Sequence, residues 1–168
     1  MWVALPLCLL STLLATDGNS FYYTGKSCLQ PKNCEPGPFS LTYPHNVTVL
    51  ANIACCDTDG CNAGAIPVPT VSSVPNGRQC PSFLRVGSYF WNGKGVLACT
   101  GTEDHCVVES GILALGNIIL RNTAARCGSP GACVKRLLLK KYAKGVVEIL
   151  SQAKCYPAPR AGGGIGEP

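Results

Sequence analysis

Long hydrophobic runs, histidines and charged side chains are scarce in this 168-residue chain. No run of about 20 apolar residues is present, which argues against a transmembrane helix. The C-terminal sequence PRAGGGIGEP is polar and lacks the hydrophobic tail of a lipid-anchor signal. A freely soluble protein without a membrane anchor is therefore expected. Charged residues make up 14% of the chain and hydrophobic residues 46%, a balance that disfavours intrinsic disorder.

Cysteine, in contrast, is abundant, with 12 residues beside 19 glycines and 13 prolines. The usual cysteine spacing of a zinc site is absent, and so many thiols are unusual in a reducing cytosol. The cysteines therefore argue against an ordinary cytosolic enzyme and indicate a disulfide-stapled protein made in an oxidising compartment.

The N-terminus is interpreted as a secretory signal peptide over residues 1–16. Trp2–Ala15 carries no charge, is too short to span a bilayer and suits the apolar region of such a signal, although no Lys or Arg precedes Lys26. The alternative is a buried core segment. Cleavage would remove Cys8 and leave 11 cysteines, an odd number that needs an explanation.

Two cysteine-bearing blocks follow, at residues 21–62 (block one) and 80–157 (block two). Residues 63–79 between them contain three prolines and an Asn-Gly turn signal, so they are predicted to be a linker. Residues 158–168 are predicted to form a flexible tail. Neither block is large enough to be stable by core burial alone, so disulfides are needed as staples.

Local signals inside the blocks favour strands. Residues 47–54 are β-branched and apolar, and residues 96–99, 106–108 and 118–120 are short apolar runs bounded by glycine or polar residues. Residues 134–150 (VKRLLLKKYAKGVVEIL) leave two alternatives open. Their leucine and lysine content suits a helix, whereas a disulfide between the flanking Cys133 and Cys155 would favour a strand hairpin.

The most specific motif is CCDTDGCN at residues 55–62, which has the form CCxxDxCN. This form closes domains of the Ly-6/urokinase-receptor family, and the chain resembles that family, whose members have the three-finger fold. Residues 76–81 (NGRQCP) and 98–106 (ACTGTEDHC) are similar to the second domain of gamma-type phospholipase A2 inhibitors. Those proteins are secreted and have two tandem three-finger domains. The ending CYPAP at residues 155–159 agrees with this resemblance, which covers roughly residues 23–159.

The resemblance implies a small disulfide-rich all-β fold of tandem three-finger domains. The first of these is incomplete, because the opening CxxC segment of the family has no counterpart before Cys28. It implies that Asn62 closes the base of the first domain and that Cys28 is unpaired. The implied disulfides are Cys34–Cys55, Cys56–Cys61, Cys80–Cys106, Cys99–Cys127 and Cys133–Cys155.

Enzymatic chemistry is not expected. Secreted phospholipases place a catalytic histidine near a CC motif, but the only histidines here are His45 and His105. His105 follows Asp104, and adjacent residues of an extended segment point to opposite faces, so a solvated histidine is expected. Oxidised cysteines cannot hold zinc, and neither a metal nor another cofactor is predicted.

Three features are candidates for binding or modification. Asn46 begins the sequon Asn-Val-Thr and is a glycosylation candidate. Aromatic side chains either anchor a partner or pack between fingers; they are Tyr22, Tyr23, Phe90 and Trp91. A run of cations without an acid is either a basic patch for an acidic partner, heparan chains or anionic lipid, or a solvated finger face; it comprises Lys135, Arg136, Lys140, Lys141 and Lys144.

The function implied by the resemblance is that of a secreted, extracellular, non-enzymatic binding protein. Its partner would be a secreted phospholipase A2, or another extracellular protein, and inhibition would follow from steric blocking of access to lipid. The alternatives are a secreted three-finger ligand or receptor modulator without inhibitory activity, and a truncated isoform without stable function. Self-association remains open, and nucleic-acid binding is not expected because no aromatic residues interleave the cations.

Overall fold

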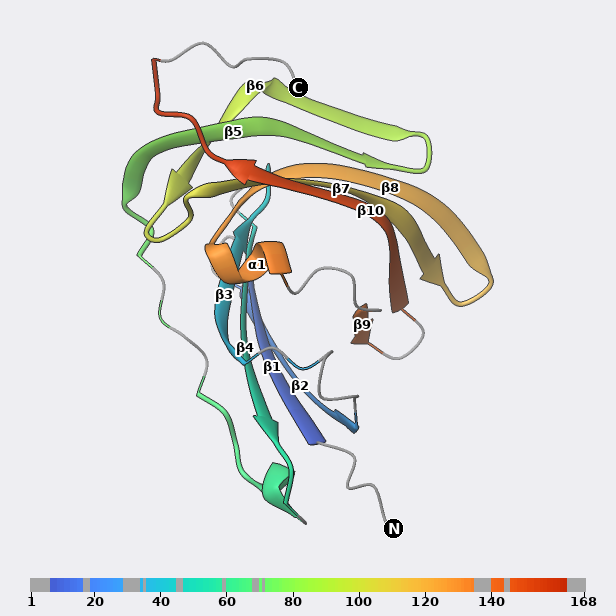
Figure 1. The fold of residues 1–168 in the computed structure, drawn as a ribbon. Coiled ribbons are helices and arrows are strands. Elements are labelled where there is room, and N and C mark those ends of the chain that lie inside the picture. Colours follow the sequence, from blue (N-terminus) through green and yellow to red (C-terminus); the bar gives the residue numbers. More distant parts are fainter. Residues whose placement is uncertain are drawn as a thin grey trace.

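The computed structural model describes residues 7–16, 19–28, 34, 36–44, 47–58, 60–67, 70, 72–134, 140–143 and 146–162, some of them by their backbone alone. Within these ranges the chain is almost entirely strand, with one short α-helix and one short 3-10 helix (Figure 1). The predicted small, disulfide-rich all-β fold is confirmed, and it is consistent with a three-finger fold. The elements are β1 (Leu7–Thr16), β2 (Asn19–Cys28), β3 (Gly37–Thr42), β4 (Thr48–Cys56), η3 (Cys61–Ala63), β5 (Pro75–Val86), β6 (Tyr89–Thr100), β7 (His105–Leu115), β8 (Ile118–Gly128), α1 (Pro130–Val134), β9 (Lys140–Ala143) and β10 (Val146–Pro157).

Tight turns set the lengths of the fingers in block two. Gly87 begins the turn between β5 and β6 with φ 59°, and Gly116 begins the turn between β7 and β8 with the same φ. These left-handed conformations suit glycine, which has no Cβ to clash with the backbone. The β7–β8 ladder then runs without a break from Leu115 and Ile118 at the turn to His105 and Gly128 at the base.

The two blocks share one sheet in the strand order β2-β1-β4-β3-β8-β7-β10-β9, and β5 and β6 attach through β8. The junction is the short antiparallel pairing of Leu41 and Thr42 in β3 with Gly128 and Cys127 in β8. Figure 1 shows the strands of block two running across the top and β1 to β4 running down from them. Block one is therefore attached to the base of the fingers by backbone pairing.

The apolar segment near the N-terminus is a strand in this structure. Leu7–Thr16, which lies in the predicted signal peptide, forms β1 and pairs with β2 on one side and β4 on the other. The backbone of Leu7 faces Cys28 on β2 and Cys56 on β4. Cleavage of residues 1–16 stays a prediction about processing, and so does the alternative of a buried core segment.

The structure bears on three segments whose boundaries or conformation the sequence analysis predicted: the linker, residues 134–150 and the C-terminal tail. Strand β5 begins at Pro75, inside the predicted linker at residues 63–79. Residues 140–143 and 146–150 are strands, because β10 pairs along β7 and with β9. The start of the predicted flexible tail is packed: Ala158 is buried, and Arg160 forms a β-bridge with Arg78.

Among the described residues, packed hydrophobic side chains form two small clusters. The first contains four buried cysteines with Ala158, against which Leu97 and Tyr156 pack. The second contains Leu41, Val107 and Ala132. A core of this size supplies limited hydrophobic stabilisation, so cross-links and polar networks carry more of the stability than in a larger domain. No helix among the described residues has the length and apolarity needed to cross a membrane.

Candidate binding surface

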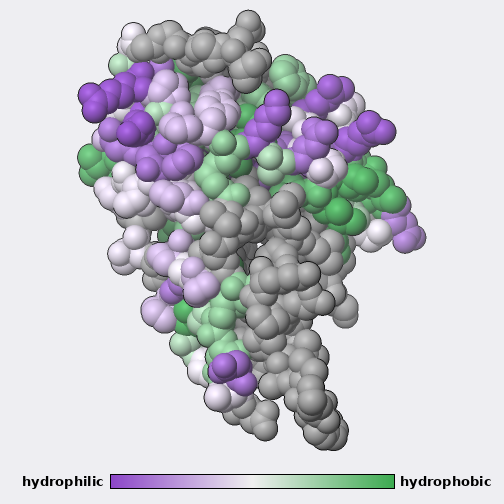
Figure 2. Space-filling model, in the orientation of Figure 1, coloured by the Kyte–Doolittle hydropathy of each residue, from purple (hydrophilic) through white to green (hydrophobic). Residues whose placement is uncertain are grey.

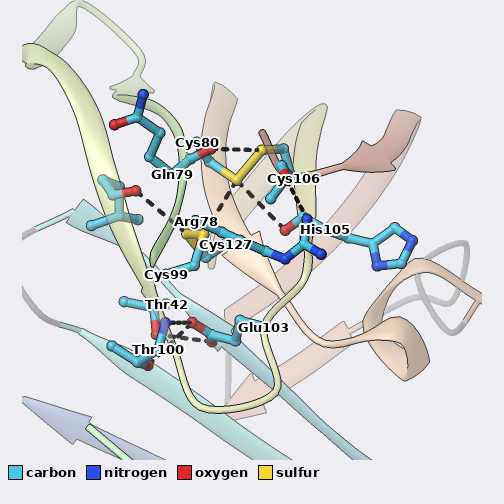
Figure 3. The surroundings of a disulfide bond; sticks show 12 residues. Thr42, Arg78, Gln79, Cys80, Cys99, Thr100, Glu103, His105, Cys106 and Cys127 are labelled. Carbon is cyan, nitrogen blue, oxygen red and sulfur yellow. Dashed lines mark hydrogen bonds between the residues drawn. A yellow bond between two sulfur atoms is a disulfide. The ribbon is translucent and has the colours of Figure 1, made fainter. Parts of the chain in front are cut away.

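The base of the fingers is a cluster of disulfides (Figure 3). Cys80–Cys106 joins β5 to β7, and Cys99–Cys127 joins β6 to β8; all four residues are 0% exposed. With Cys34–Cys55, Cys56–Cys61 and Cys133–Cys155, the described residues contain the same five pairs that the resemblance implies. Pairwise Cα separations of 5.3–6.1 Å suit disulfide geometry.

A metal site at this cluster is not supported by its chemistry. The sulfurs of Cys80, Cys99 and Cys127 lie within 4.8 Å of one another, a spacing that a metal ion would accept. Each of them is already bonded to another sulfur. Zinc binds the thiolate, so these sulfurs serve as cross-links.

The Glu103 side chain joins the two blocks beside the disulfide cluster (Figure 3). Glu103 is 2% exposed, and its Oε1 accepts a hydrogen bond of 2.9 Å from the Thr42 hydroxyl of block one. Its Oε2 accepts from the backbone N–H and the hydroxyl of Thr100, at 3.2 and 3.3 Å. Asn76 donates to the carbonyl oxygens of Glu103 and Gly101. The two motifs similar to the inhibitor family, at residues 76–81 and 98–106, therefore meet here.

Burial raises the pKa of Glu103 above its usual 4.5, and the hydrogen bonds from Thr42 and Thr100 offset part of that rise. The folded chain consequently holds this proton more tightly than the unfolded chain. Relative to a Glu103→Gln variant, the free energy of unfolding of the wild type should fall as the pH rises from about 4.5 through the raised pKa. Urea denaturation between pH 4 and pH 8 measures this difference.

A Thr42→Val variant tests the cause of the Glu103 prediction. It removes a hydrogen bond that favours the charged carboxylate, so the decline with rising pH should become steeper than in the wild type. A difference between the wild type and Glu103→Gln that stays constant over the whole pH range would contradict the assignment.

A buried ion pair lies on the neighbouring strands. Arg126 of β8 pairs with Glu109 of β7, and both side chains are 1% exposed. The ring of Tyr43, which follows β3 of block one, covers the guanidinium with its centroid 3.9 Å from Cζ. Ser40 and Ser129 add two hydrogen bonds: the Ser40 N–H donates to the Ser129 hydroxyl, and the Ser129 N–H donates to the Ser40 carbonyl. Block one is thus fixed on block two by polar contacts as well as by sheet pairing.

His105 and Asp104 are closer than the sequence predicted. The His105 Nδ1 atom lies 2.6 Å from an Asp104 carboxylate oxygen. The expectation that the two side chains point to opposite faces is wrong, because Asp104 precedes β7 and does not follow strand alternation. Neighbouring Cys80 and Cys106 are bonded to each other, so neither thiol can act as a nucleophile beside this pair.

One hollow in the described part of the chain has no ionisable side chain in its lining. It measures about 310 Å³, lies where α1 meets β3, and is bordered by side chains such as Phe39, Ser40, Thr102 and Ser129. Proline, glycine and threonine complete the border. Without a base, an acid or an activated nucleophile, this hollow offers no acid–base or nucleophilic chemistry.

Large apolar side chains are instead exposed on the fingers. Figure 2 shows hydrophobic residues gathered over the far ends of β7 and β8. The exposed side chains include Tyr89, Phe90, Ile112, Ile118, Ile119 and Ile149. Of these, sequence reasoning singled out only Phe90. The sequence signal for the exposed isoleucines was a set of apolar positions in predicted strands. Which of these side chains face solvent can be learned only from the strand register.

Several predicted site residues lie wholly or partly outside the described residues. This holds for Asn46 and for Lys135, Arg136 and Lys144. Only the backbone is described for Lys140 and Lys141 in β9, for Cys28 at the end of β2 and for Asn62 in η3. The side chains of Tyr22, Tyr23 and Trp91 are likewise not described. The basic patch, the glycan, the unpaired cysteine and the closing asparagine stay predictions.

The described residues define a small, disulfide-linked protein of β fingers. Its candidate binding site is an exposed surface on those fingers. Comparison with known proteins is specific about the family, although no family model matches the chain. The chain is 31% identical over 143 residues to a phospholipase A2 inhibitor gamma subunit of Elaphe climacophora, covering 83% of this chain and 68% of that protein. It is 29% identical over 142 residues to the protein of the same name from Elaphe quadrivirgata, with the same coverage. The chain belongs to the family of phospholipase A2 inhibitor gamma subunits.

Proposed function

We propose that this protein is a secreted inhibitor that binds a phospholipase A2 and sterically blocks its access to lipid. The observation that carries the proposal is the 31% identity to an inhibitor gamma subunit over 83% of this chain. The fold agrees with such a role, because rigid fingers expose aromatic and aliphatic side chains of the kind that dominate protein interfaces.

The proposed mechanism requires no chemistry on the lipid. A bound protein the size of this chain, 17.6 kDa, would cover a surface of the enzyme that must otherwise contact the lipid aggregate. The disulfide cluster holds β5 to β8 in fixed relation, so little conformational freedom remains to be lost on binding. Block one is part of this rigid body, since Thr42 and Tyr43 contact Glu103 and Arg126 of block two.

Secretion is part of the proposal and rests on the apolar N-terminus and the five described disulfides. Removal of residues 1–16 would take β1 out of the sheet and leave one edge of β2 and one edge of β4 without their partner. Exposed edges favour pairing with another strand, so the processed protein would re-pair β2 with β4 or associate through them.

The test is complex formation in lipid-free solution. The oxidised, secreted protein should co-elute in size-exclusion chromatography with at least one member of a panel of secreted phospholipases A2. The same enzyme should then lose activity on phospholipid vesicles in proportion to the fraction bound. The protein after reduction and alkylation is the matched control, and it should do neither, because the fingers depend on their disulfides.

An absence of any complex with folded, oxidised protein across the panel would overturn the proposal. That outcome would favour a three-finger ligand or receptor modulator without inhibitory activity. A complex without loss of activity would retain binding but refute steric blocking.

A further inference from the structure

Exposed side chains of block two share one face of the sheet. In the register, Ile112 of β7 lies opposite Arg121 of β8 and opposite Ile149 of β10. Ile119 lies two residues before Arg121 in β8, so it is on the same face, because successive side chains of a strand alternate. On the same side, Arg85 of β5 lies opposite Thr123 of β8 and Phe90 of β6. We call this set the finger face; it comprises Arg85, Phe90, Ile112, Ile119, Arg121 and Ile149.

The apolar members of the finger face are open to solvent. Ile119 is 70% exposed, Phe90 58%, Ile149 48% and Ile112 38%. The three isoleucines lie near the end of the β7–β8 hairpin. This hairpin extends beyond the turn of the β5–β6 hairpin. At that turn, the Gly87 N–H donates a hydrogen bond of 2.7 Å to the Arg121 carbonyl. The hydrophobic patch over these strand ends is seen in Figure 2. Hydrophobic side chains therefore lie at a projecting edge.

Among the described residues, the charged side chains of the finger face, Arg85 and Arg121, are both positive. Arg85 and Arg121, with Gly87 and Thr123, line a hollow of about 280 Å³ next to the isoleucines. Neither guanidinium is paired with a carboxylate among the residues described. The nearest acid on β7, Glu109, occupies the opposite face and is buried with Arg126. The hollow thus offers unpaired cations beside exposed hydrocarbon.

We propose that the finger face binds the surface of an anionic phospholipid bilayer. Guanidinium groups bind phosphate oxygens through paired N–H donors, which suits a hollow with arginines from two strands. Isoleucine side chains at a projecting edge gain free energy by entering the boundary between headgroups and acyl chains. A second copy of the chain is a poorer occupant, because it would bring two further arginines against the first two.

Lipid binding by the finger face goes beyond phospholipase binding and does not depend on it. It would place the protein on the same surface as the enzyme it is proposed to inhibit, and so raise the local concentration of both. The complex with the enzyme is measured without lipid, and lipid binding is measured without enzyme. Failure of one proposal can therefore be told from failure of the other.

The test is sedimentation of the oxidised protein with vesicles of phosphatidylcholine, with and without phosphatidylserine. Binding is expected to the anionic vesicles, and it should weaken as salt rises because exposed charges are screened. Ile119→Thr keeps a β-branched residue and should weaken binding roughly fivefold. Ile118→Thr is the matched control: its side chain is 59% exposed but lies on the opposite face, so affinity should stay unchanged.

The arginines are tested in the same assay. Arg121→Gln should weaken binding to anionic vesicles roughly fivefold, since each cation near such a surface adds about that factor. Arg160→Gln removes the same charge from an exposed residue beside β5 and away from the finger face, and should have a smaller effect. Equal losses in the two isoleucine variants, or equal binding to neutral vesicles, would overturn the proposal. So would self-association that Ile119→Thr abolishes in the absence of vesicles.

Discussion

Replacing Arg126 with methionine is expected to lower the free energy of unfolding by about 3–5 kcal/mol, because it leaves the Glu109 carboxylate buried without its cation. Both side chains are 1% exposed, so solvent cannot replace the lost partner. The Tyr43 ring also loses the guanidinium that it covers. Urea denaturation of the oxidised protein at pH 7 measures the change.

A double variant separates the ion pair from the packing of its parts. Arg126→Met combined with Glu109→Leu removes both charges and keeps hydrocarbon at the site, so most of the lost stability should return. The corresponding double-mutant cycle, with Glu109→Leu as the second single variant, gives the coupling between the two residues. A single Arg126→Met variant that loses less than about 1 kcal/mol would show that the pair is not isolated from solvent.

Contacts at this ion pair and at Glu103 make the stability of block two depend on block one. Tyr43 covers Arg126, and Thr42 binds the carboxylate of Glu103. Two buried charges of block two therefore have partners supplied by block one. Loss of block one would expose both charged side chains to solvent or remove their partners. The stability of the fingers of block two is therefore coupled to block one.

The sequence was sufficient for the strands and the fold class because their signals are local. The apolar run at residues 47–54 became β4, and the runs at residues 96–99, 106–108 and 118–120 fell inside β6, β7 and β8. For residues 134–150, composition suited a helix and the flanking cysteines suited a strand hairpin. The described parts, residues 140–143 and 146–150, are strands, and β10 pairs with both β7 and β9. Tertiary pairing thus decided these described parts.

The polar network could not be predicted, since it depends on contacts far apart in the chain. Thr42 and Glu103 are separated by 61 residues, and no periodic pattern marks either of them as a partner. The finger face is similar: Ile112, Arg121 and Ile149 meet only because of the strand register. The two side chains of Asp104 and His105 were predicted to point to opposite faces, on the assumption that both residues are in a strand. Strand β7 begins only at His105, so the alternation rule does not apply to Asp104.

Removal of the Cys99–Cys127 disulfide, by changing both residues to alanine, is expected to lower the free energy of unfolding by about 3–4 kcal/mol. The bond joins residues 28 apart in sequence, so its loss releases a long loop in the unfolded chain. Both residues are 0% exposed and belong to the larger cysteine cluster, so lost packing adds to the chain-entropy effect. Urea denaturation of the purified monomer, with the remaining disulfides verified by mass spectrometry, measures the change.

The Cys56–Cys61 disulfide is the matched control for this prediction. It joins residues only 5 apart, and Cys61 belongs to the short η3 helix at the far end of block one. The same loop-entropy relation gives about 2 kcal/mol for so short a loop. The two double-alanine variants should therefore differ by more than about 1 kcal/mol, on the order of tenfold in the unfolding equilibrium. Equal losses would mean that the cluster at the base of the fingers is no more important to stability than a peripheral loop, which is contrary to its complete burial.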